Sequence, residues 1–544
     1  MTPEPIPAKE AIHTDEEDAG APWRYLLGWH FVALLIVVVL SGAIRWRLLD
    51  MPLERDEGEY AYAGQLILQG IPPYQIAYNM KLPGTYAAYA AMLAVFGQSS
   101  RGIHLGLLVV SAASIILFYA IVARLFGTLA GIVAGWGYAL LSTHQSVLGF
   151  AAHATHFVVL AALIGLILLL RAKETTRIVV LFWSGLAFGI AFLMKQPGIF
   201  LSLFAFVYLA GQCWPKRPDE WTLWAKKMGA FLLGAVLPFA LTCALLYRAG
   251  VFERFWFWTF LYARQYATSL PLRAGWEALK STSSHIVDAA PELWALALIG
   301  VSTAFWDPIV RRHAALIFGL LVSSCAAVCP GLYFREHYFV LIMPAVAMLI
   351  AMAIVSISRL LTTKFPARWF HVLPVFVFGV AWMLAVVRNR DFYFKLTPPQ
   401  ACRYCYPAEP FLEAASVAEY LHQHTTATDT IMVLGSEPEI YFYANRHSAS
   451  GFIYTYSLMA DQAYWPTMQK QMIREVEGNR PAYVVFVNAW GSWNARAGSL
   501  QALALGTWMD QYISNGFELA RTVPVQNSEL SYSFGEIRIF KKRG

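Results

Sequence analysis

The sequence predicts a multi-pass α-helical membrane protein with about 11 transmembrane helices and a C-terminal extracytoplasmic α/β domain. Of the 544 residues, 58% are hydrophobic and only 14% are charged, whereas an average soluble domain has roughly 45–50% apolar and about 25% charged residues. The apolar residues gather in runs close to the length that a membrane-spanning helix needs. Charged and polar residues return from about residue 392 onward. This composition excludes the soluble, disordered and disulfide-framework classes.

Each apolar run is expected to be helical, because a segment inside the bilayer must satisfy its backbone hydrogen bonds internally. The runs are 25–44, 103–123, 128–144, 154–170, 178–194, 197–213, 229–246, 291–306, 314–329, 338–357 and 371–387. The first run has no basic segment before it and no small-residue cleavage site after it, so we interpret it as a membrane anchor rather than a removed signal.

The charges of the loops predict the orientation. One set of loops is short and basic, with residues such as Arg171, Lys173 and Arg311, and we place it in the cytoplasm. The chain then divides into three parts. These are a cytoplasmic tail (1–24), a transmembrane domain (25–391) whose outer loop 50–102 carries juxtamembrane helices, and a periplasmic or extracellular soluble domain (392–544). We expect the protein in the cell membrane, the inner membrane in a bacterium.

The soluble domain is expected to contain strands at 430–434, 483–487 and 537–540. Between the first two, Ser436 followed by Glu439 predicts a helix that starts at Ser436, with the serine as its N-cap. Cys402 and Cys405 form a C-x-x-C pair. A local disulfide is favoured there over a zinc site, because no second Cys or His pair accompanies it.

The outer loop 50–102 carries the most informative charges. Asp56 and Glu57 are adjacent just after the first span, where charges are costly unless they are used or paired. On a helix, neighbours point about 100° apart. One of the two is therefore expected to face a cavity while Arg55 or a backbone N-cap holds the other; a solvated acidic helix start is the alternative. Lys81 lies among aromatic and apolar residues, where it either snorkels to the interface or contacts a phosphate.

This loop resembles the corresponding loop of the GT-C superfamily. The resemblance rests on the Asp56-Glu57 pair, the helix that contains Tyr60, the Pro72-Pro73-Tyr74 turn and the K-x-P-x-x-Y element from Lys81 to Tyr86. Within the superfamily, it points to the group that contains protein O-mannosyltransferases and the aminoarabinose transferases that modify lipid A. The resemblance implies transfer of a sugar from a polyprenyl-phosphate carrier to an acceptor at the outer face of the membrane.

The resemblance also implies roles for individual residues. Asp56 matches the catalytic base and Lys81 the lysine that meets the lipid phosphate. Glu57 matches the acidic neighbour of the base and is expected to be catalytic too, by orienting Asp56 or binding the acceptor. Tyr60 and Tyr86 are expected to contact substrate or phosphate. In the aminoarabinose transferases a glutamate that can help bind a metal precedes this lysine.

Two departures from the family pattern bear on a metal. Met80 stands where that glutamate would be, and His156 stands where the family often has a second acid. The sequence therefore leaves open whether the site binds a divalent cation.

Further polar groups fall on the same side of the membrane by the alternation of spans. Lys195, Arg335 and His337 are candidate phosphate or substrate contacts, with interface anchoring or a local Arg335–Glu336 pair as the alternatives. Glu336, His153 and His156 are candidate contacts to the acceptor or a cation. The two histidines are three residues apart and could share a helix face or cap the helix.

We therefore predict an inverting hexosyl- or pentosyltransferase. Its partners are a polyprenyl-phosphate sugar donor, membrane lipid, and an acceptor lipid, glycan or protein. Nucleic acid is not expected, because no basic stripe accompanies the net charge of +7. The alternatives are a transporter or lipid flippase, which intramembrane charges also suit, and a non-enzymatic scaffold. A shared outward cavity that holds Asp56 and Lys81 would favour the transferase.

Overall fold

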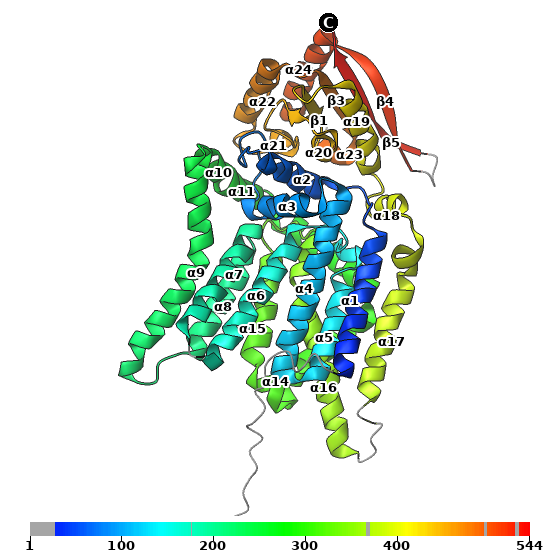
Figure 1. The fold of residues 1–544 in the computed structure, drawn as a ribbon. Coiled ribbons are helices and arrows are strands. Elements are labelled where there is room, and N and C mark those ends of the chain that lie inside the picture. Colours follow the sequence, from blue (N-terminus) through cyan, green and yellow to red (C-terminus); the bar gives the residue numbers. More distant parts are fainter. Residues whose placement is uncertain (1–27, 176, 366–369, 371, 494–497, 528–531) are drawn as a thin grey trace, which may run out of the picture.

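The computed structural model describes residues 28–544 except 176, 366–369, 371, 494–497 and 528–531. The predicted tail 1–24 lies outside the described residues. The described chain forms a bundle of long helices with a smaller, sheet-containing part at one end (Figure 1).

Within the described residues, each apolar run predicted from the sequence coincides for most of its length with a helix. These helices are α1 (Trp29–Arg47), α4 (Ser100–Phe126), α5 (Thr128–Leu141), α6 (Ala154–Thr175), α7 (Ile178–Met194), α8 (Gly198–Gln212), α9 (Trp221–Arg248), α13 (Pro291–Trp306), α15 (Ala314–Val328), α16 (Met343–Lys364) and α17 (Leu373–Arg388).

Five helices of the described chain are long and apolar enough to cross a membrane. The number rises to six if α12 (Leu272–Ala289) and α13, which meet at an angle of 103°, count as one broken span. The other apolar helices, such as α5 and α8, are shorter. The chain is thus a multi-pass membrane protein, and the count of eleven spans stays a prediction.

Two shorter helices lie crosswise over the end of the bundle, between it and the sheet (Figure 1). They are α2 (Arg55–Leu68) and α3 (Pro83–Phe96). A capping box fixes the start of α2: the Glu54 carboxylate accepts from the backbone N–H of Glu57 at 2.8 Å, and the Glu57 carboxylate accepts from that of Glu54 at 3.4 Å. Pro83 begins α3, where its missing N–H costs no hydrogen bond.

The sheet has five strands in the order β2-β1-β3-β5-β4. They are β1 (Thr430–Leu434), β2 (His447–Ser448), β3 (Tyr483–Ala489), β4 (Phe517–Asn527) and β5 (Tyr532–Lys542). The β2-β1-β3 pairs are parallel and the β3-β5-β4 pairs are antiparallel. The three predicted strands are present within β1, β3 and β5, whereas β2 and β4 were not predicted. The domain boundary at 392 stays a prediction.

Short elements complete the described fold. They are η2 (Gln145–Val147), η3 (Pro218–Glu220), α10 (Phe252–Trp256), η4 (Phe257–Tyr262), α11 (Ala263–Ala267), α14 (Pro308–Arg312), η5 (Glu336–Leu341), η7 (Asp391–Lys395), α18 (Pro398–Cys405), α19 (Phe411–His424), α20 (Glu439–Ala444), α21 (Tyr456–Met459), α22 (Trp465–Asn479), α23 (Trp490–Trp493) and α24 (Leu500–Gly516).

Two expectations for the soluble part are wrong. Helix α20 starts at Glu439 with Pro438 at its N-cap, and Ser436 makes no cap. The Ser436 hydroxyl is buried instead and lies 3.0 Å from the hydroxyl of Thr455, so tertiary contacts outweigh the local capping pattern. Cys402 and Cys405 are both free thiols on α18 rather than a disulfide.

Helix α2 packs closely against the sheet-containing part. The rings of Tyr62 and Tyr441 stack with centroids 5.2 Å apart. A Cβ on Gly58 would lie 2.6 Å from the backbone nitrogen of Glu439, so only glycine lets α2 and α20 approach this closely.

We expect Gly58→Val to destabilise the protein by about 1–3 kcal/mol, because the added methyl groups force α2 and α20 apart. Gly42→Val is the matched control, since nothing lies within 4 Å of a Cβ at that helical position. Thermal unfolding of the two purified variants in detergent measures the difference. Equal midpoints would show that this contact does not limit stability.

Candidate active site

A cavity of about 970 Å³ lies where α2, the loops before α6 and α8, η5 and the sheet-containing part meet. Asp56 reaches it from the first turn of α2, and Lys81 reaches it from the segment that leads into α3. The predicted residues that line it are Asp56, Tyr60, Lys81, His153, Lys195, Arg335, Glu336 and His337. Segments far apart in the sequence therefore share one site.

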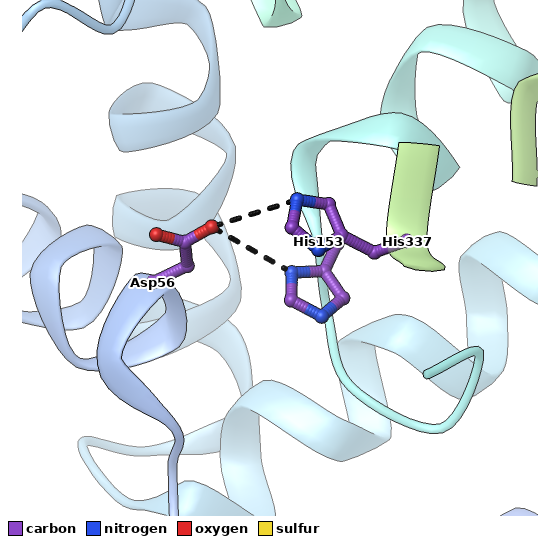
Figure 2. Close-up of side chains that lie close together, drawn as sticks. All are labelled: Asp56, His153 and His337. Carbon is purple, nitrogen blue, oxygen red and sulfur yellow. Dashed lines mark ion pairs between the residues drawn. The ribbon is translucent and has the colours of Figure 1, made fainter. Parts of the chain in front are cut away.

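Asp56 is the most strongly engaged carboxylate of the cavity. Its Oδ1 lies 2.5 Å from Lys81 Nζ. Its Oδ2 lies 3.7 Å from His337 Nε2 and 4.0 Å from His153 Nδ1 (Figure 2). Burial alone would raise the pKa of Asp56, but the Lys81 ammonium and His153 hold this pKa well below its usual range. Asp56 is therefore ionised at neutral pH.

Lys81 is held by a second carboxylate. Its Nζ lies 3.0 Å from Glu59 Oε2 and 4.6 Å from the centroid of the Tyr60 ring. The Tyr86 hydroxyl donates to the other oxygen of Glu59 at 2.5 Å. Burial lowers the pKa of Lys81, but Asp56 and Glu59 outweigh it and hold this pKa well above its usual value. Lys81 therefore stays charged although it is about three-quarters buried.

Two further cations of the cavity lie against aromatic rings. Lys195 Nζ is 3.9 Å from the centroid of the Tyr338 ring, and the Arg335 guanidinium is 5.9 Å from that of Tyr333. Burial lowers the pKa of Lys195 to about 7. Within the described part of the chain, neither side chain has a carboxylate within ion-pair distance. Their positive charge is available to an anionic ligand.

Three predicted residues do not line the cavity. Glu57 is buried on another side of α2, because adjacent residues of a helix point in different directions. Tyr86 lies behind Lys81 and contacts Glu59. His156 is inside α6 whereas His153 precedes it, so the two histidines do not share a helix face. The sequence correctly predicted that Asp56 and Glu57 point in different directions. It did not predict that His153 lies outside the helix that contains His156.

Sequence reasoning missed several residues of the site. Glu54, Glu409, Tyr454 and Tyr456 line the cavity, the last three from the C-terminal region. Glu59 lies three residues after Asp56, a spacing that places both on one helix face and could have identified it. For the three residues from the C-terminal region, no local sequence pattern indicated that they belong to the site.

Arg55 joins the site to the C-terminal region. Its guanidinium lies 2.7 Å from Glu409 and 3.1 Å from Glu437, and it donates to the Ser436 carbonyl at 2.6 Å. The Arg55 carbonyl accepts from the Tyr454 hydroxyl at 2.8 Å. The residue before Asp56 is therefore fixed on both its side chain and its backbone.

Asp56, His153 and His337 could together hold a divalent cation. Their ligand atoms lie within 4.8 Å of one another, while donors of a tetrahedral zinc site at about 2.1 Å from the metal are roughly 3.4 Å apart. Both ring nitrogens of His153 are buried without a hydrogen-bond partner, which suits a metal ligand. The His153 and His337 rings stack with an interplanar angle of 11°, so one ring must rotate to direct both lone pairs at one ion. A bound cation would supply further positive charge to a phosphate.

The fold and the cavity define a multi-pass membrane protein with a buried, highly charged site beneath a small α/β part. Residues 81–248 match the family model described as dolichyl-phosphate-mannose-protein mannosyltransferase. No curated protein sequence matches the chain.

The solved structures that share the fold include the following three. ArnT from Cupriavidus metallidurans bound to undecaprenyl phosphate has a TM-score of 0.57 at 14% identity, over 94% of this chain and 98% of that chain. The apo state of ArnT gives 0.52 at 15% identity, with the same coverage. The Archaeoglobus fulgidus oligosaccharyltransferase tethered to an acceptor peptide gives 0.50 at 13% identity, over 86% of this chain and 70% of that chain.

The chain therefore has the fold of the GT-C superfamily glycosyltransferases, and the resemblance predicted from its first outer loop is confirmed.

If the three ligands act together, we expect the purified protein to bind one Co²⁺ ion per chain with visible d–d absorption. His153→Ala and His337→Ala should each abolish this absorption, and substitution of the exposed His424 by Ala should leave it unchanged. Absorption that survives both substitutions would place any bound cation elsewhere.

Proposed function

We propose that this protein is a membrane glycosyltransferase that moves a sugar from a polyprenyl-phosphate donor to an acceptor hydroxyl or amine. The observation that carries the proposal is the shared cavity, in which the ionised carboxylate of Asp56 lies 2.5 Å from Lys81. Lys195 and Arg335 add positive charge to the same wall. The bound undecaprenyl phosphate of ArnT, which shares the fold, supports a lipid-phosphate donor.

The chemistry of such a donor needs a base and positive charge. Asp56 accepts the proton of the acceptor O–H or N–H while the acceptor oxygen or nitrogen bonds to the anomeric carbon of the sugar. The bond between that carbon and the phosphate oxygen breaks, and the polyprenyl phosphate leaves with the electron pair. A single displacement of this kind inverts the configuration of the sugar.

Lys81 is assigned to the departing phosphate, with Lys195 and Arg335 as helpers. Two of the three N–H groups of Lys81 face Asp56 and Glu59. A phosphate that enters the cavity competes with Asp56 for Lys81, because both anions reach the lysine from the cavity side. Loss of the lysine contact would raise the basicity of Asp56 just when the acceptor proton must be removed.

The arrangement of the elements supports a location for the site. Helices α2 and α3 and the C-terminal part lie at the same end of the bundle (Figure 1). The short basic loops favour the cytoplasm for the opposite end. We place the cavity and the C-terminal domain on the periplasmic or extracellular side of a cell membrane, the bacterial inner membrane in a bacterium. The shared cavity favours this enzyme over a transporter or flippase.

We expect Asp56→Asn to lower sugar transfer by at least about 100-fold, because the amide cannot accept the acceptor proton. Asp50→Asn is the matched control, since Asp50 lies in the same loop but is exposed and pairs with Arg101. Purified protein is incubated with radiolabelled polyprenyl-phosphate sugars and a total membrane extract as acceptor. Full transfer by Asp56→Asn would remove the base assignment, and no transfer by the wild type would contradict the proposed function.

Transfer should also depend on pH through Lys195. Its pKa of about 7 means that the side chain is charged below that pH and loses its charge above it. If the charge assists the phosphate, the rate falls by roughly tenfold per pH unit above the pKa. Lys195→Arg keeps the charge and should move the decline to higher pH. An unchanged alkaline limb in a pH–rate profile of this variant would exclude Lys195 as the titrating group.

A further inference from the structure

We infer that Glu57 is a positioning residue that fixes His153 in the cavity through the backbone, rather than a group that meets substrate. The inference rests on the proposed function, in which His153 lines the site. Glu57 is 2% exposed and does not line the cavity. Its Oε1 accepts from the backbone N–H of Ala152 at 2.6 Å. Ala152 immediately precedes His153 in the chain.

The Glu57 carboxylate is itself held from two other sides. His104 Nε2 lies 3.2 Å from the same Oε1, and Oε2 accepts from the backbone N–H of Glu54 at 3.4 Å. The other ring nitrogen of His104 lies 2.8 Å from the Leu49 carbonyl oxygen. The carboxylate therefore has its hydrogen-bonding positions engaged and a fixed direction, which points toward the 149–153 segment.

Side chains anchor the 149–153 segment at two further backbone groups. The Tyr89 hydroxyl donates to the Ala152 carbonyl at 2.8 Å, and the Arg45 guanidinium donates to the Gly149 carbonyl at 2.9 Å. Ala152 is thus held at both its N–H and its C=O. The path of the backbone into His153 is determined by side chains of α1, α2 and α3.

The His153 side chain has few direct restraints of its own. Within the described residues, both its ring nitrogens lack a hydrogen-bond partner. The ring stacks on His337 at 4.0 Å, and Nδ1 lies 3.6 Å from Glu54 and 4.0 Å from Asp56. Because the ring is not held by hydrogen bonds, its position follows from the anchored backbone. Of the three side-chain anchors, Glu57 makes the shortest hydrogen bond, and its negative charge strengthens that bond.

A double-mutant cycle tests this role. Glu57→Gln keeps the size of the side chain but removes the charge that strengthens the Ala152 hydrogen bond. We expect kcat to fall by about 10- to 100-fold, since small displacements of a site residue can have this effect. The KM for tritiated undecaprenyl-phosphate sugar should change by less than about twofold. His153→Ala should lower kcat as well, and the double variant should be no slower than His153→Ala alone.

Two further variants keep the test valid if Glu57→Gln does not fold. Tyr89→Phe removes the other anchor of Ala152 without changing charge, and its loss of kcat should also disappear in the His153→Ala background. Glu277→Gln, which removes an exposed acid paired with Arg273 on α12, is the control and should leave the rate unchanged. Thermal midpoints confirm that each variant is folded.

The possible outcomes distinguish a failure of the positioning role of Glu57 from a failure of the proposed transferase activity. Multiplying losses in the double variants, wild-type kcat in Glu57→Gln, or wild-type kcat in His153→Ala would each overturn the inference while the enzyme remains a transferase. A wild type that transfers no sugar would instead contradict the proposed function.

Discussion

The ion pair between Asp56 and Lys81 is the interaction on which the rest of the cavity depends. It joins the first turn of α2 to the segment that enters α3, and so fixes the geometry of the outer loop. Both side chains are about three-quarters buried, at 25% and 22% exposed. Removal of one partner of such a largely buried pair leaves the other charge less well compensated, which costs stability. An anionic ligand that takes the place of Asp56 beside Lys81 avoids this cost. The lysine can therefore exchange its contact with the Asp56 carboxylate for a contact with the ligand.

The cations of the cavity are not all used in the same way. Arg55 is neutralised by Glu409 and Glu437 and connects the site to the C-terminal region. Lys81 is neutralised by two acids of α2. Lys195 and Arg335 lie over tyrosine rings, where a cation is stabilised without loss of its charge. Arg55 therefore supplies structural positive charge, whereas Lys195, Arg335 and, once a ligand replaces Asp56, Lys81 supply ligand-binding positive charge beside the candidate base.

Local patterns in the sequence predicted the helices and the first outer loop, since the length of an apolar run and a family motif are both local properties. Helix geometry predicted that Asp56 and Glu57 point in different directions, but it did not predict that Glu57 is the buried one. Nor did it predict the Glu57 partners His104 and Ala152, because they come from other elements. The contacts of Arg55 with Glu409 span more than 350 residues. At Ser436 a local pattern was misleading instead: the capping sequence is present, but the serine hydroxyl makes a tertiary hydrogen bond rather than a helix cap.

The proposed mechanism is tested most directly by a structure of the full chain with undecaprenyl phosphate bound. It predicts that the phosphate lies within hydrogen-bond distance of Lys81 Nζ, near Lys195 and Arg335, and that the Asp56 carboxylate has separated from the lysine and faces open cavity. A phosphate outside this cavity, or one bound while Asp56 and Lys81 keep their 2.5 Å contact, would contradict the central claim.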